Sequence, residues 1–135
     1  MADVKAACEK HWDRWKGDCS GFVRAVAGEL GVPLTGTANA MVDAMARQGG
    51  VWQSLGHDGM QATRYANQGF FVVAGLKSTA HGHVAVIVPS ASAGYPFGYW
   101  GRLGGVGRKN TAINWAWNHQ DLPRVEYFAR QVGGH

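Results

Sequence analysis

A cysteine at the start of a predicted helix is the residue of this sequence with the clearest capacity for chemistry. Cys19 follows Asp18 in the stretch GDCSGFVRAVAGEL, residues 17–30. A thiol attacks as its thiolate, and the free amide groups and dipole of a helix N-terminus favour that charged form. The same amide groups can stabilise an oxyanion formed at a carbonyl. Two interpretations of Cys19 stay open at this point, a nucleophile and a small buried hydrophobic residue.

A nucleophilic cysteine requires a general base, which need only be its neighbour in space. Two of the six histidines lie in the stretch AHGHVAVIVP, residues 80–89. His83 opens the most apolar predicted strand and shares a face with Ala85 and Ile87, so its imidazole would project from a rigid element. His81 precedes a glycine and is expected in the loop. We therefore expect His83 to be the base for Cys19.

The second cysteine has no such setting. Cys8 falls in the apolar stripe of the first predicted helix, which indicates a packed position. Two cysteines in a chain of this size do not form a disulfide framework. A single Cys8–Cys19 bridge would consume the thiol that the sequence presents at the helix start, so we expect both residues to be reduced.

The elements that must position these residues follow from the spacing of apolar side chains. Repeats of three and four predict helices over 2–15 and over 19–30, with two more beginning at residues 39 and 58. Short runs rich in β-branched and aromatic residues predict strands over 69–76, 83–89, 95–100, 113–118 and 124–132, the last of which could also be helical. Helices followed by strands indicate an α+β fold with an antiparallel sheet.

The length, composition and charge of the chain argue against a membrane protein and against a nucleic-acid-binding protein. The 135 residues, 46% of them hydrophobic, predict a single domain over 1–135. No apolar run approaches the roughly 20 residues of a membrane span, and the N-terminus does not resemble a secretory signal. The net charge of +4 is compatible with an anionic polymer. Its basic residues are scattered without a nucleic-acid-binding motif, so we expect no nucleic-acid partner and no membrane insertion.

The motifs DCSGFV and GHVAVIV, in that order, resemble the NlpC-type cysteine peptidase superfamily. The longer stretches DCSGFVRAVAGELGVPLTGTANAMVDAM, NQGFFVVAGLK and YPFGYWG closely resemble the type VI secretion amidase effectors of family one, from about Cys8 to Tyr127. The resemblance implies a papain-like α+β fold in which N-terminal helices pack on the sheet. It also implies hydrolysis of the bond between γ-D-glutamate and meso-diaminopimelate in peptidoglycan stem peptides.

The resemblance assigns roles residue by residue. Cys19 matches the nucleophile and His83 the general base, while Ser20 and Gly21 match the flanking residues that contact substrate. The main-chain carbonyl that orients the histidine in this family falls near Trp100. No metal and no cofactor are implied. The implied partners are the type VI secretion apparatus and a cognate periplasmic immunity protein, with export that needs no signal peptide and action in the periplasm of target Gram-negative cells.

Three alternatives share some of these features. A phage or housekeeping wall hydrolase of the NlpC or CHAP type would use the same chemistry. A metal hydrolase could use His81 and His83 with Cys19 or Asp18, although no third ligand has convincing spacing. A non-catalytic wall-binding module could contact glycans through some of the six tryptophans and four tyrosines, which would leave Cys19 and His83 idle.

Overall fold

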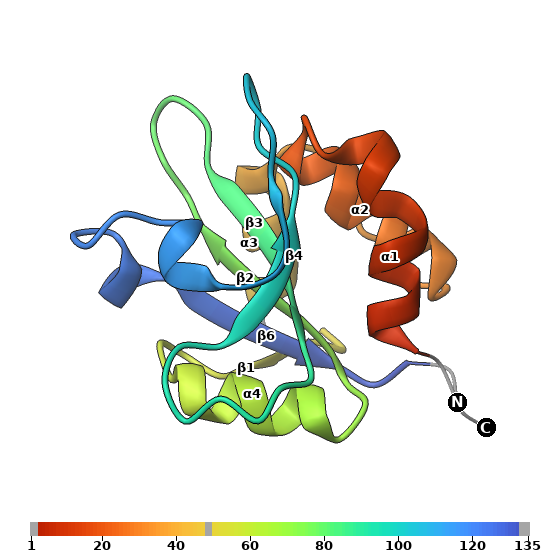
Figure 1. Cartoon of the computed structure of the whole chain (residues 1–135), viewed down its shortest axis with the longest axis vertical. Coiled ribbons are helices and arrows are strands. Elements are labelled where there is room, and N and C mark those ends of the chain that lie inside the picture. The colour runs from red at the N-terminus through yellow and green to blue at the C-terminus, as the bar shows by residue number, and fades with distance from the viewer. Residues whose placement is uncertain (1–2, 48–49, 133–135) are drawn as a thin grey trace.

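The computed structural model describes residues 3–47 and 50–132 of the chain (Figure 1). The helices in these ranges are α1 (Val4–Trp15), α2 (Cys19–Glu29), α3 (Ala38–Ala46) and α4 (Gly59–Asn67). The strands are β1 (Gln53–Ser54), β2 (Phe71–Leu76), β3 (His83–Val88), β4 (Phe97–Trp100), β5 (Arg108–Ala112) and β6 (Glu126–Arg130). Two 3-10 helices, η1 (Ile113–Trp115) and η2 (Leu122–Arg124), lie between β5 and β6. No helix in the described ranges has the length and apolar character needed to cross a bilayer.

The strands form one antiparallel sheet in the order β1-β6-β2-β3-β4-β5. The central strand β2 pairs Val73 with Val86 of β3 and with Phe128 of β6. The predicted α+β class, with N-terminal helices packed on an antiparallel sheet, is therefore confirmed. The more specific papain-like, NlpC-type arrangement stays a prediction.

The sheet is covered on both faces, which explains why its central strands are apolar without interruption. Alternate residues of β3 enter two different clusters: Val84, Val86 and Val88 pack with α1, α2 and α3, whereas Ala85 and Ile87 pack with α4. Figure 1 shows α1 and α2 on one side of the sheet and α4 beneath the other. Because β3 is buried on both faces, His83 is carried by one of the most constrained strands of the molecule.

Each α-helix begins at a side chain that accepts an amide hydrogen bond. Asp3, Asp18, Thr37 and Asp58 occupy the N-cap positions of α1 to α4, and each accepts from the backbone N–H three residues later. This is the preferred way to satisfy one of the free amide groups at a helix start. The predicted helix over 2–15 thus begins at Val4, and its residue 2 lies outside the described part of the chain.

The strand predicted over 113–118 is wrong. Ile113 begins the 3-10 helix η1, and the Ala116 N–H donates to the Ile113 carbonyl at 2.8 Å. Ile113 and Trp117 are both buried in the α4-side cluster. A spacing of four fits a strand as well as a turn of helix, so burial alone could not distinguish the two, and the local hydrogen bond decides. The edge strand is instead β5, whose polar sequence RKNTA lacks the expected apolar alternation. The two-residue strand β1 was not predicted, whereas 124–132 contains β6 and is confirmed as a strand.

Candidate active site

A cavity of about 650 Å³ opens where the start of α2 meets the start of β3. Its walls come from the α2 and α3 starts, the β2–β3 loop, the end of β4 with the loop that follows, and the η1 segment. The lining residues are Asp18, Cys19, Ser20, Thr37, Ala38, His81, Gly82, His83, Trp100, Arg102, Leu103, Asn114, Trp115, Ala116, Trp117 and Asn118. Segments from both halves of the chain therefore build one site.

Cys19 is the first residue of α2, as the sequence predicted, and its thiol faces β3. The Asp18 carboxylate caps the helix by accepting from the Gly21 N–H at 3.2 Å and from the Ser20 hydroxyl at 3.2 Å. The backbone N–H of Val84 hydrogen bonds to the Cys19 thiol, so the sulfur lies beside the residue that follows His83. Cys19 is 6% exposed. The start of α2 thus places a buried thiol beside the start of β3, the strand that carries the candidate base.

The electrostatics of the thiol differ from the expectation drawn from a helix start. Burial raises the pKa of Cys19, and the Asp18 carboxylate raises it further. Hydrogen bonds from the backbone N–H groups of Val84, Ser20 and Cys19 itself lower the pKa without reversing the shift. Loss of water around the anion outweighs the favourable amide groups. In the resting protein the Cys19 side chain is therefore a neutral thiol at neutral pH.

His83 is held neutral as well. Burial lowers its pKa from 6.5 to about 4, and the nearby Arg102 charge acts in the same direction. The imidazole packs edge-on against the indole of Trp117, with ring centroids 5.0 Å apart and an interplanar angle of 64°. A neutral imidazole is the form that can accept a proton, and a packed ring holds its orientation. His83 is thus ready to act as a base across the whole neutral pH range.

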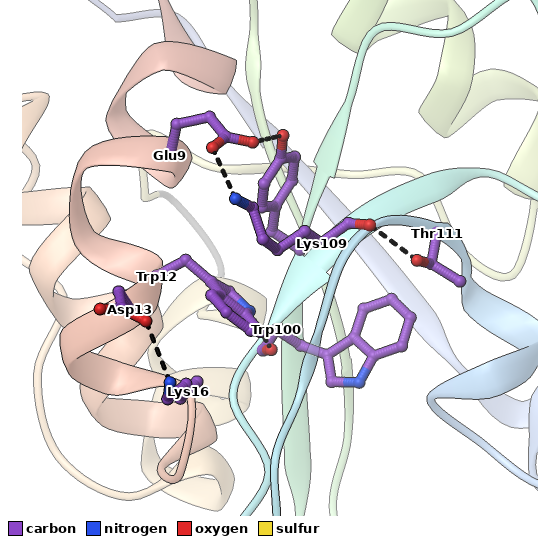
Figure 2. A network of polar contacts seen from close by, with 8 residues as sticks. Glu9, Trp12, Asp13, Lys16, Trp100, Lys109 and Thr111 are labelled. Atoms are coloured by element: carbon purple, nitrogen blue, oxygen red, sulfur yellow. Dashed lines mark hydrogen bonds and ion pairs between the residues drawn. The ribbon is translucent and has the colours of Figure 1, made fainter.

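The Trp100 carbonyl, expected to orient the histidine, already accepts one hydrogen bond. The indole N–H of Trp12 on α1 donates to it at 3.0 Å. Figure 2 shows this carbonyl oxygen directed at Trp12 while the Trp100 indole points away from α1. A carbonyl oxygen has two lone pairs, so the bond from Trp12 leaves it able to accept from a second donor. The role of the Trp100 carbonyl in orienting His83 stays a prediction.

A polar network behind the cavity ties α1 to β4 and β5 (Figure 2). Glu9 on α1 accepts a hydrogen bond from the Tyr99 hydroxyl and forms an ion pair of 2.9 Å with Lys109. The Lys109 ammonium also lies 5.5 Å from the centre of the Trp12 ring. The hydrogen bond from Tyr99 and the contact with Lys109 lower the pKa of Glu9. The network fixes the strand that ends at Trp100 against the helix that leads to Cys19.

The structure brings most of the predicted site residues together. Cys19, Ser20, His83 and Trp100 all line the cavity. Gly21 lies behind them: a Cβ there would stand 2.4 Å from a ring carbon of Trp15, so the glycine lets the Trp15 ring pack against the first turn of α2. Its predicted contact with substrate is untested, and close packing supplies a separate reason for a glycine at this position.

Several lining residues were missed by sequence reasoning. Arg102 and Leu103 follow β4, and Trp115, Trp117 and Asn118 come from the segment predicted as a strand. No local pattern marks these positions, because they reach the cavity only through the path of the loops.

The remaining chemistry of the described residues is limited. Cys8 is fully buried in the core, and both cysteines are free thiols, as expected. Within residues 3–47 and 50–132, no three His, Cys, Asp or Glu side chains gather closely enough to hold a metal ion. The described residues therefore offer no third ligand that could join His81 and His83, as the metal hydrolase interpretation would require.

Comparison with known proteins gives the same result as the motifs. No family model matches the chain. The peptidoglycan amidase Tse1 of Pseudomonas aeruginosa is 40% identical to it over 135 aligned residues, which cover 90% of this chain and 85% of the relative. Identity at this level over nearly the full length of both proteins confirms the predicted relationship. This chain belongs to the family of type VI secretion amidase effectors that includes Tse1.

Proposed function

We propose that this protein is a peptidoglycan amidase that cleaves the bond between γ-D-glutamate and meso-diaminopimelate in stem peptides. Cys19 is the nucleophile and His83 the general base. The observation that carries the proposal is that a helix-start cysteine and a strand-start histidine line one cavity in a member of this family. The 40% identity to a peptidoglycan amidase supports the substrate class.

The geometry supports a sequence of acyl transfer steps. Neutral His83 takes the Cys19 proton as the sulfur attacks the γ-glutamyl carbonyl, which forms a carbon–sulfur bond and an oxyanion. The backbone N–H groups of Cys19 and Ser20, at the free end of α2, stabilise the oxyanion. The oxyanion then collapses and the carbon–nitrogen bond breaks as protonated His83 gives its proton to the amine of diaminopimelate, which leaves a thioester on Cys19. Water activated by His83 hydrolyses the thioester and releases the γ-glutamyl carboxylate and the free thiol.

The resting state supports general-base activation rather than a preformed ion pair. Burial raises the pKa of Cys19 and lowers that of His83 to about 4. The proton therefore stays on sulfur until substrate binds. Attack and proton transfer then occur together, so the buried site never holds an unstabilised charge pair.

The biological setting follows from the same family membership. We propose that residues 1–135 act as a single catalytic domain without cofactor, exported by a type VI secretion apparatus. It acts in the periplasm of rival Gram-negative cells. A cognate immunity protein protects the producing cell by covering the cavity. A gene for a small periplasmic protein next to this one would distinguish this role from that of a phage or housekeeping wall hydrolase.

The test is a digest of purified Gram-negative sacculi followed by mass spectrometry of the released fragments. The wild type is expected to release fragments cut between D-glutamate and diaminopimelate, and Cys19→Ala and His83→Ala are expected to release none. Cys8→Ala is the matched control for the thiol, because Cys8 is buried in the core. His81→Ala is the control for the imidazole, because His81 lines the same cavity.

Two outcomes would contradict the proposal. Sacculi left intact by the wild type would favour the wall-binding module, since binding requires no reaction. Loss of cleavage on addition of EDTA, together with loss in His81→Ala, would favour the metal hydrolase.

A further inference from the structure

Arg102 is an exposed cation at the cavity that forms no ion pair with any side chain in the described ranges. The ion pairs of the described residues engage other basic groups: Lys10, His11, Lys16, Lys77, Lys109 and Arg124. Arg102 instead lines the cavity together with Cys19 and His83. Because no acidic side chain of residues 3–47 and 50–132 pairs with it, the guanidinium can donate hydrogen bonds to a ligand.

The backbone of Arg102 is held close to the nucleophile. Its N–H donates to the Lys16 carbonyl at 3.0 Å, and the Gly107 N–H donates to the same oxygen at 2.8 Å. These bonds satisfy a carbonyl at the end of α1 that has no partner within the helix. The preceding residue, Gly101, approaches the Asp18 carbonyl so closely that a Cβ there would lie 2.5 Å from its oxygen. The position from which the Arg102 side chain extends is therefore fixed against the start of α2.

Two arginines lie at or near the cavity: Arg102 lines it, whereas Arg108 is outside the lining, with its guanidinium 4.7 Å from the centre of the Trp115 ring. The Asp18 carboxylate, which also lines the cavity, accepts from the Gly21 N–H and the Ser20 hydroxyl. Among the described lining residues, Arg102 is the only lysine or arginine. Its charge reaches the catalytic centre, since it contributes to the lowered pKa of His83. An anionic group on a substrate bound in the cavity would thus find a cationic side chain in the lining.

We propose that Arg102 binds a free carboxylate on one of the two residues that flank the scissile amide, and so determines specificity for acidic stems. The inference rests on the proposed function. A γ-linked D-glutamate keeps its α-carboxylate free beside that bond on the acyl side. On the amine side, one carboxyl group of diaminopimelate continues the stem peptide, and the other is free at the far end of the side chain. The planar guanidinium can donate two parallel hydrogen bonds to either group.

The test measures kcat/KM on three synthetic stem peptides at about pH 8, where His83 is neutral with or without the Arg102 charge. One peptide carries D-glutamate and diaminopimelate with free carboxylates, the second has the glutamate α-carboxylate as an amide, and the third has the diaminopimelate carboxylate as an amide. The variants are Arg102→Gln, Arg102→Lys and Arg64→Gln. Arg64 is the matched control, an exposed arginine in the last turn of α4.

Arg102→Gln is expected to lower kcat/KM on the free-acid peptide by about 10- to 100-fold, the usual range for a hydrogen bond to a charged group. Arg102→Lys should recover part of the loss, and Arg64→Gln should show none. On one of the amidated peptides, wild type and Arg102→Gln should become equal, and that peptide identifies the carboxylate. An equal loss on all three peptides would overturn the inference, because it would indicate a structural defect. A wild type that cleaves none of them would instead refute the proposed function itself.

Discussion

The neutral state of His83 predicts a specific dependence of stability on pH. Burial lowers the pKa of His83 from 6.5 to about 4. As the pH falls from 6.5 to about 4, the imidazole is therefore protonated in the unfolded chain but stays neutral in the folded protein. Proton uptake by the unfolded state alone stabilises that state. The contribution of His83 to stability is therefore complete above about pH 7 and is lost progressively as the pH falls toward 4.

The magnitude follows from the shift. Each pKa unit corresponds to about 1.4 kcal/mol, so lowering the pH from about 7.5 to about 4.5 should cost the wild type about 2.5 kcal/mol through this one group. His83→Gln has no titrating ring and should lack this loss. The low pKa values of Glu9 and Glu29 also reduce stability in acid, but both carboxylates are present in both proteins. The difference between the two proteins thus isolates His83.

Urea denaturation of both proteins at the two pH values measures the effect. The free energy of unfolding of the wild type should fall by about 2.5 kcal/mol more than that of His83→Gln. The absolute stabilities can differ for packing reasons, since the variant loses the ring that contacts Trp117. Only the change with pH tests the argument. Equal losses in the two proteins would refute it, because they would show that the folded state leaves the imidazole hydrated.

Three further predictions concern the residues around the cavity. Burial raises the pKa of Cys19, so its alkylation by iodoacetamide should keep accelerating above about pH 8; a plateau near neutrality would reveal a thiolate. Gly101→Ala should lower the melting temperature sharply, by the equivalent of more than about 2 kcal/mol, because the added Cβ would stand 2.5 Å from the Asp18 carbonyl oxygen; an unchanged transition would contradict this packing. Trp12→Phe removes the donor to the Trp100 carbonyl and should cost about 1 kcal/mol in urea denaturation. If Trp12→Phe were as stable as the wild type, water would have replaced the hydrogen bond to the Trp100 carbonyl.

Local features of the chain could be predicted because they depend on residues near each other in sequence. Asp18 caps α2 through an amide three residues away, and the apolar stripe after Cys19 repeats over single turns of that helix. The continuous apolar run of β3 likewise indicates a strand buried on both faces. Position 19 at a helix start and position 83 at a strand start were therefore predictable from the sequence.

The properties that make a site of these positions depend on groups far away in the chain. The sequence by itself determined which residues could react and which elements carry them. Only the tertiary structure decided that Arg102 reaches the same cavity and that the Cys19 thiol rests in its neutral form. The edge strand β5 and the helix η1 were misjudged for the same reason, since their burial is set by distant partners. Desolvation of a charged group depends on everything packed around it, whereas caps and periodicity act only between near neighbours.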